Sequence, residues 1–167
     1  MNNQRVLSFP MKKVLLTCLA MCLTMMALAD DFSLRGERKV TLCVDWSEAT
    51  IVGYTSENIN TYEPDWDKDQ NVLLMKMILT FNKHLGAALP AVKEGDTNYT
   101  IELRPIFVSD RGDMTCYAVI KDRQGNVVET FPNFKAEGGH CGSFLNLVGD
   151  GMKSSGKQLA KRVKKLL

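Results

Sequence analysis

Alternating hydrophobic and polar positions predict the strands of this chain. In residues 39–46 every second side chain is apolar and would face one side of a half-buried strand: Val40, Leu42, Val44 and Trp46. The alternation returns in residues 99–108, where Tyr99, Ile101 and Leu103 would face inward, and two more strands are expected over residues 114–121 and 127–131. Segments rich in Asp and Gly, residues 110–113 and 122–126, predict turns between these last three strands.

Two segments carry apolar residues at helical spacing. The first helix is predicted over about residues 68–85, and its apolar stripe is expected to face the core: Leu74, Met77, Ile78, Phe81 and Leu85, widened by Val72, Leu73, Met75 and Leu79. Gly86 would end this helix, and residues 53–66 before it are predicted to form a long polar loop. The second helix covers about residues 144–167, with one apolar side made of Leu145, Val148, Met152, Leu159, Val163 and Leu166.

The element order β-α-β-β-β-α predicts an α+β fold. A sheet with one apolar face and two amphipathic helices buries most apolar surface when both helices pack on one face of a small, mainly antiparallel sheet. We expect one hydrophobic cluster between these layers, made of Val44, Trp46, Leu74, Ile78, Phe81, Ile101, Leu103, Leu145 and Val148.

Residues 1–29 are predicted to be a secretory signal peptide, with translation starting at Met11. Two lysines precede an apolar run over residues 14–26, and Ala27-Leu28-Ala29 has the small residues of a cleavage site. Residues 30–167 would then form a single exported domain, in the periplasm or outside the cell.

Two other uses of the apolar run are possible in principle. A retained membrane anchor would need a longer apolar stretch than residues 14–26 provide. A lipoprotein attached through Cys22 would need a small residue before the cysteine, and that position is Met21. We therefore favour soluble export over both.

Composition and charge fit an ordinary globular domain. The 167 residues are 45% apolar and 24% charged, which excludes disordered, collagen-like and coiled-coil chains. Without residues 1–29 the chain has 18 basic and 19 acidic residues, and this balance gives no overall attraction for nucleic acid or an anionic membrane. We expect no nucleic-acid partner, no cofactor, and no membrane contact beyond the signal peptide.

Three cysteines remain in the predicted exported chain: Cys43, Cys116 and Cys141. In an oxidising compartment they allow at most one internal disulfide, and their spacing leaves open which pair, if any, forms it. No CxxC or HxxxH spacing accompanies them, so we expect no metal site.

A Gly-rich segment before the last helix is the candidate site. It comprises Gly138, Gly139, His140, Cys141, Gly142 and Ser143. Free N–H groups at a helix N-terminus can bind an anion or a carboxylate. The segment holds no lysine or arginine to assist an anion, so we favour a structural turn that leads into the helix.

A small cysteine hydrolase is the enzymatic alternative. Residues 139–143, GHCGS, are similar to the nucleophile turn G-x-C-G-G of chymotrypsin-like cysteine proteases, in which a histidine base activates the cysteine. Beyond His140 the chain has one histidine, His84, and it falls at the end of the first helix rather than in a β-barrel. We therefore expect a protein that is not an enzyme.

A phosphate-loop spacing, G-x-x-x-x-G-K, occurs at residues 151–157. Gln158 replaces the hydroxyl residue that would bind Mg²⁺, and only nine residues follow it, too few for a nucleotide-binding fold. We expect no nucleotide partner.

The last helix suggests a third possibility, binding to a membrane surface. Its basic residues are Lys153, Lys157, Lys161, Arg162, Lys164 and Lys165. Because they alternate with apolar residues expected in the core, we favour a solvated face. A membrane-surface role would require the basic residues on one continuous exposed face with apolar residues beside them.

Residues 138–151, with the pattern Gly-Gly-x-x-Gly-Ser-Phe-x-Asn-Leu-x-Gly-Asp-Gly, resemble a group of small exported bacterial proteins of unknown function, as does Val-Asp-Trp-Ser at residues 44–47. The element order is also similar to the N-terminal domain of TolB and to the periplasmic domain of the curli secretion channel. The resemblance implies an exported, non-enzymatic binding or assembly module, and we expect an envelope protein as its partner. It supplies no catalytic residues.

Overall fold

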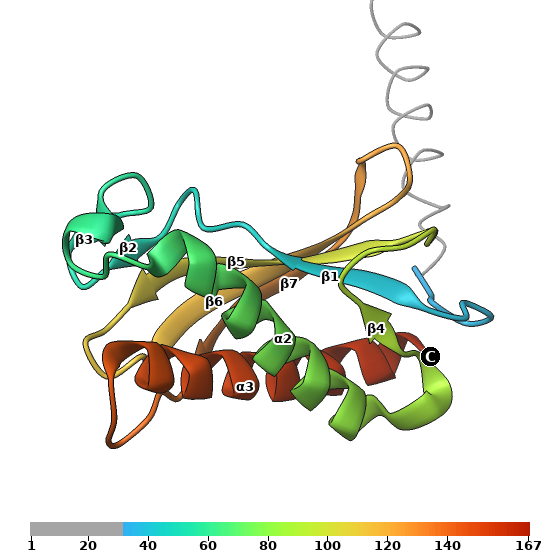
Figure 1. Ribbon diagram of the computed structural model, residues 1–167. Coiled ribbons are helices and arrows are strands. Elements are labelled where there is room, and N and C mark those ends of the chain that lie inside the picture. The colour runs from blue at the N-terminus through green and yellow to red at the C-terminus, as the bar shows by residue number, and fades with distance from the viewer. Residues whose placement is uncertain (1–31) are drawn as a thin grey trace, which may run out of the picture. The chain divides into compact units, whose positions relative to one another are not determined.

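A mixed seven-stranded sheet forms one layer of the fold in the computed structural model, which describes residues 32–167 (Figure 1). The long strands lie in the order β1 (Val40–Val44), β5 (Thr100–Val108), β6 (Met114–Lys121) and β7 (Val127–Ala136). Short strands extend it: β4 (Ala91–Val92) beside β1, β2 (Thr50–Ile51) beside the end of β5, and β3 (Tyr54–Thr55) beside β2. The predicted signal peptide, its start at Met11 and the cleavage site before Asp30 lie outside the described residues.

The prediction of a mainly antiparallel sheet was wrong, because three of the six pairings among the described strands are parallel. β1 lies parallel to β5, with Leu42 opposite Ile101, and both β4 and β2 join their neighbours in parallel. Between the parallel neighbours β1 and β4 the chain passes through β2, β3 and the helix α2, a long crossover of the kind that parallel neighbours require. Alternation along a strand does not report its direction, so the sequence pattern could not reveal this.

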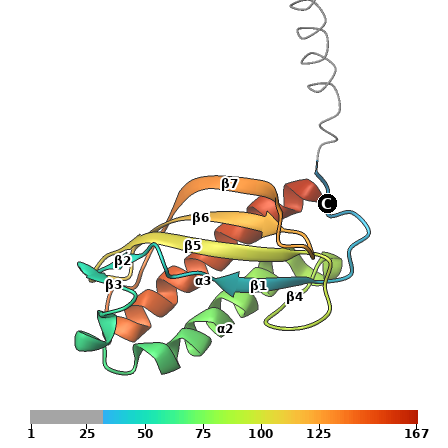
Figure 2. The ribbon, with the colours of Figure 1, turned by 90° about the horizontal axis from the view of Figure 1, so that it is seen from above.

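Two helices, α2 (Trp66–Leu85) and α3 (Phe144–Val163), pack against each other on one face of the sheet (Figure 1, Figure 2). This arrangement confirms the predicted α+β class and the placement of both helices on one face. Short 3-10 helices lie at Ile59–Thr61 (η1), Gly86–Ala88 (η2) and Lys164–Leu166 (η3).

Two element boundaries differ from the prediction. The segment predicted as a loop, residues 53–66, contains β3 and η1, and α2 begins inside it at the fully buried Trp66. β7 continues beyond the predicted end at Phe131 and passes through Pro132. Among the described strands β7 pairs only with β6, and an edge strand tolerates proline because one row of its N–H groups needs no partner.

The core lies between the sheet and the helices, and most of the predicted cluster belongs to it. Six of the nine residues are buried as expected: Trp46, Ile78, Phe81, Ile101, Leu103 and Val148. Val44, Leu74 and Leu145 are only half-buried, so the prediction was wrong for them. It was also wrong for part of the first helix, because Val72, Met75 and Leu79 lie on the side of α2 that faces away from the sheet and are exposed.

Val52→Asn is expected to raise the free energy of unfolding by about 1 kcal/mol, because asparagine adopts a positive φ more readily than valine. Val52 has a φ of 51° in the two-residue turn between β2 and β3, where Gly53 has a φ of 85°. Such a turn requires a positive φ at both positions, and a β-branched side chain is strained there. Urea denaturation would measure the change, with Gly53→Val as a control that should lower stability. An unchanged or lower value for Val52→Asn would contradict the strain.

Candidate functional site

The candidate loop, residues 138–143, connects β7 to α3 and is bonded to the turn between β5 and β6. The N–H of Gly138 donates to the Asp113 carboxylate at 2.8 Å. The N–H of Gly139 donates to the carbonyl oxygens of Arg111 and Leu147, at 3.1 Å and 3.2 Å. These bonds hold the first half of the loop against the body of the protein.

The second half of the loop begins the last helix. Ser143 is its N-cap, and its hydroxyl oxygen accepts a hydrogen bond from the N–H of Asn146 at 3.4 Å. His140 and Cys141 are exposed. The side chains that carry chemistry therefore point to solvent from a segment whose backbone is fixed.

Close packing accounts for several glycines in and after this loop. A Cβ on Gly138 would overlap the backbone of Arg111 and Gly112, and a Cβ on Gly151 would overlap the carbonyl oxygen of Gly112. A Cβ on Gly139 would lie 2.8 Å from the Leu147 Cδ2 atom. These contacts favour the structural interpretation of the Gly-rich segment, and binding of an anion there stays a prediction. Gly151 and Lys157, which frame the phosphate-loop spacing, lie within α3.

The structure does not bring His84 and Cys141 together. The N-terminal ends of α2 and α3 are close, since the rings of Trp66 and Phe144 are 6.4 Å apart. Cys141 lies just before this end of α3, whereas His84 lies in the last turn of α2. At about 1.5 Å of rise per residue, His84 is about 27 Å farther along. A base at this distance cannot activate the thiol.

The three cysteines are free thiols in three different environments. Cys116 is fully buried, and burial raises the pKa of its thiol to about 12. Cys43 lies on the sheet face opposite the helices, and burial, followed by the charge of Glu102, raises the pKa of its thiol to about 11. Cys141 is exposed in the loop. None of the disulfides that the sequence left open is present among them.

Cys141 is expected to react with a soluble thiol reagent at pH 8 at least about tenfold faster than Cys43, because only the thiolate attacks and Cys43 is then about one-thousandth ionised. The Cys43 rate should rise as the pH approaches 11, and Cys116 should react only on unfolding. Mass spectrometry of the labelled protein would assign each site, and Cys141→Ser should remove the fast reaction. Rapid labelling of Cys43 at pH 8 would contradict the assigned environment.

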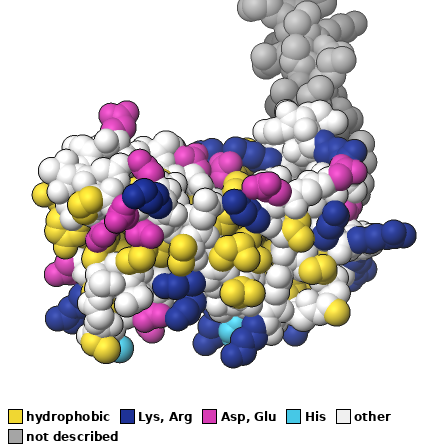
Figure 3. Space-filling view, in the orientation of Figure 1, with side chains coloured by type: hydrophobic (Ala, Val, Ile, Leu, Met, Phe, Trp, Pro, Cys, Tyr) yellow, Lys and Arg dark blue, Asp and Glu magenta, His cyan; other side chains and the backbone are white. Residues whose placement is uncertain are grey.

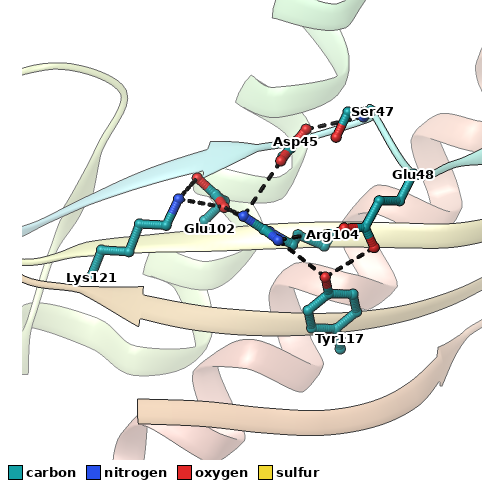
Figure 4. Close-up of polar contacts among 7 residues, drawn as sticks. All are labelled: Asp45, Ser47, Glu48, Glu102, Arg104, Tyr117 and Lys121. Carbon is teal, nitrogen blue, oxygen red and sulfur yellow. Dashed lines mark hydrogen bonds and ion pairs between the residues drawn. The ribbon is translucent and has the colours of Figure 1, made fainter. Parts of the chain in front are cut away.

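A charged network surrounds Arg104 on the sheet face opposite the helices, which we call the open face (Figure 4). One guanidinium nitrogen of Arg104 is 2.7 Å from Glu102 and 3.6 Å from Asp45, and another donates to the Tyr117 hydroxyl at 3.2 Å. The Tyr117 hydroxyl in turn donates to Glu48 at 3.1 Å. The bonds to Tyr117 and Glu102 raise the pKa of Arg104, which therefore stays charged.

Every charged group of the network has a partner of opposite charge within it. The Lys121 ammonium group also binds Glu102, at 2.8 Å, so this carboxylate lies between two cations. The hydrogen bonds that Asp45 accepts from Ser47 lower its pKa and keep it ionised. We assign the network a structural role, because it links the end of β1 to β5 and β6. Its hydrogen-bond donors are bonded to acceptors within the network. The sequence pattern did not predict it, since only the strand order places these residues side by side.

The side of the helix layer that faces away from the sheet, which we call the outer helix face, is apolar on α2 and basic on α3. Val72, Met75 and Leu79 are 48%, 41% and 64% exposed on α2. The lysines of α3 and η3 on this face are all exposed: Lys153, Lys157, Lys161 and Lys164. Figure 3, which has the orientation of Figure 1, shows hydrophobic and basic side chains over the helices, with some acidic ones among them. Four of the six basic residues of α3 and η3 therefore share one exposed face, next to apolar residues that the neighbouring helix supplies, whereas Arg162 packs on Phe134.

Charge is divided unevenly between the helices and the rest of the domain. α2, α3 and η3 together carry nine Lys and Arg residues against three Asp and Glu residues. The rest of residues 32–167 carries nine basic and fourteen acidic residues. A chain that is almost neutral overall thus concentrates its positive charge on the helices, which the net charge alone does not reveal.

Residues 32–167 contain neither a candidate membrane-spanning helix nor a candidate metal-binding cluster. No helix there is both long and apolar enough to span a membrane. No group of three His, Cys, Asp or Glu side chains there is placed to hold a metal ion.

Comparisons with known proteins find three solved structures with partial structural similarity to this chain. No family model and no curated protein matches the chain. One solved structure, of an uncharacterised protein, is 8% identical, covers 75% of this chain and 92% of its own, and has a TM-score of 0.45. A Xanthomonas campestris protein of the DUF330 family is 6% identical over 82% of this chain and 87% of its own, with a TM-score of 0.47. The PelC dodecamer protein of Paraburkholderia phytofirmans is 12% identical over 81% and 92%, with a TM-score of 0.40.

These similarities concern the arrangement of helices and strands and assign no activity to this chain. The expected likeness to small exported bacterial proteins of unknown function stays a prediction. Neither TolB nor the curli channel is among these three structures, so that likeness stays a prediction.

Proposed function

We propose that this chain is an exported, non-enzymatic binding module that engages an anionic partner through its outer helix face. The observation that carries this proposal is the segregation of charge, with nine basic and three acidic residues on α2, α3 and η3. Fields from such a face attract an anionic partner and orient the protein as it approaches. On the open face, in contrast, the charged side chains of the Arg104 network form ion pairs with one another.

The lysines of α3 are available for a partner. Lys153 is paired with Asp150 at 2.8 Å, but among the described residues Lys157, Lys161 and Lys164 form no ion pair with an acidic side chain. Arg162 differs from them because its guanidinium stacks on the ring of Phe134, 4.4 Å from the centroid, and so belongs to the packing of α3 on the sheet.

Binding to an isolated cell-envelope fraction tests the proposal. The exported protein should sediment with the envelope at low salt and be released as salt increases, since exposed charges are screened. The double variant Lys157→Glu, Lys161→Glu should bind at least about tenfold more weakly. The matched control, Lys93→Glu with Lys135→Glu, changes exposed lysines outside the helices and should bind within about twofold of the wild type. Equal binding by both variants, or none by the wild type, would contradict the proposal.

Export is tested separately by sequencing the N-terminus of the protein recovered outside the cytoplasm. Cleavage by a signal peptidase after Ala29 would leave Asp30 as the first residue. A recovered chain that still carries residues 14–29, or a lipid on Cys22, would contradict soluble export without affecting the binding surface.

A further inference from the structure

Three exposed apolar residues form a line along the outer side of α2. Val72, Met75 and Leu79 are separated by three and four positions, so they lie on one side of the helix. Lys68 and Lys83 continue the same line at its two ends. The opposite side of α2 is buried in the core. A row of exposed apolar residues with lysines at both ends is an amphipathic pattern directed to the outside of the protein.

The lysine row of α3 lies next to this line. The helices approach closely, since a Cβ on Gly156 would lie 2.5 Å from the carbonyl oxygen of Met77, and a Cβ on Gly149 would meet the side chain of Lys76. Both helices bury their sheet-facing sides, so their exposed sides share one face of the layer. The outer helix face therefore presents an apolar ridge, flanked by a parallel row of ammonium groups.

We infer that the outer helix face rests on the surface of an anionic lipid bilayer, an inference that builds on the proposed function. Leu79, Met75 and Val72 would contact the boundary between headgroups and acyl chains, and the lysines of α3 would contact lipid phosphates. The acidic remainder of the domain would point away from the bilayer, which repels it. The protein then binds peripherally and in one orientation.

A bilayer fits this face better than the other anionic or apolar occupants. A dimer formed through the ridge would bring two faces of like positive charge together, which opposes association. A soluble polyanion would use the lysines and leave the three apolar residues in water. Anionic lipid combines negative charge with hydrocarbon at one surface, and so uses both rows at once.

Sedimentation with vesicles of defined lipid tests the inference. The exported protein should bind vesicles made from an equimolar mixture of phosphatidylcholine and phosphatidylglycerol. Its binding to vesicles of phosphatidylcholine alone should be at least about tenfold weaker. Leu79→Gln should weaken binding to the anionic vesicles about fivefold or more, because it removes the most exposed member of the ridge. The control Val127→Gln removes an apolar residue that is 54% exposed on β7, and should change binding by less than about twofold. Thermal unfolding of each variant would confirm that the fold is intact.

The outcomes separate the two proposals. If the anionic vesicles do not bind while the envelope fraction still binds through Lys157 and Lys161, the lipid inference is overturned and the anionic partner is a protein or a polymer. Equal binding of Leu79→Gln and wild type to the anionic vesicles would also overturn it, because the ridge would then make no contact. Loss of binding to the envelope fraction itself would overturn the proposed function.

Discussion

Gly151→Ala is expected to lower the free energy of unfolding by about 3 kcal/mol. Gly151 is buried in α3 where the helix crosses the turn between β5 and β6, and a Cβ there would overlap the Gly112 carbonyl oxygen and lie 3.3 Å from Met114 Cγ. The overlapped atom belongs to the backbone, so the helix or the turn must move. In an exposed helix the same change would stabilise by about 1 kcal/mol, because alanine is the better helix former. The sign of the measured change therefore reports the close approach.

Denaturation by urea would measure this effect, with Lys157→Ala as the control on the same helix. Lys157 is exposed, and its replacement should alter stability by less than about 0.5 kcal/mol. A neutral or stabilising Gly151→Ala would show that α3 does not sit against the turn, and would remove the close-packing explanation of Gly151.

Phe81→Ala is expected to destabilise the protein by about 3–5 kcal/mol, because it leaves a cavity that the surrounding core fills only in part. The Phe81 side chain is 0% exposed and packs in the core on the buried side of α2. Leu79, two positions away on the same helix, is 64% exposed. Leu79→Ala should therefore cost less than about 1 kcal/mol.

The comparison of these two variants tests which side of α2 faces the core. Circular dichroism during thermal or urea unfolding gives both values under the same conditions. Similar losses for Phe81→Ala and Leu79→Ala would mean that Leu79 belongs to the core. The apolar ridge of the outer helix face would then not exist, and the inferred lipid contact would fail with it.

The sequence located the candidate loop but not the surface that the structure favours. Residues 138–143 were found because five glycines between positions 138 and 151 are unusual, and the structure accounts for several of them by close packing. The lysines of α3 were visible in the sequence, and they were interpreted as a solvated face because the residues between them are apolar. The sequence did not reveal the apolar ridge of α2, because helical spacing predicted that its residues lie in the core.

Local patterns by themselves determined the elements and the fold class. Period-two alternation identified β1 and β5, and helical spacing with the Gly86 cap identified α2, because the backbone geometry of each element imposes that period on its buried side chains. The order of these elements was enough to predict two helices on one face of a sheet.

Only the tertiary structure decided which side of α2 is covered and how the strands run. An apolar stripe that spans more than half of a helix, as in residues 72–85, can be buried only as far as neighbours reach it, and α3 and the sheet leave Val72, Met75 and Leu79 uncovered. Strand direction depends on the path of the chain through α2 and β4, which alternation does not record. The basic outer face and the Arg104 network likewise join residues far apart in sequence, because charges on separate elements act together only after packing places them side by side.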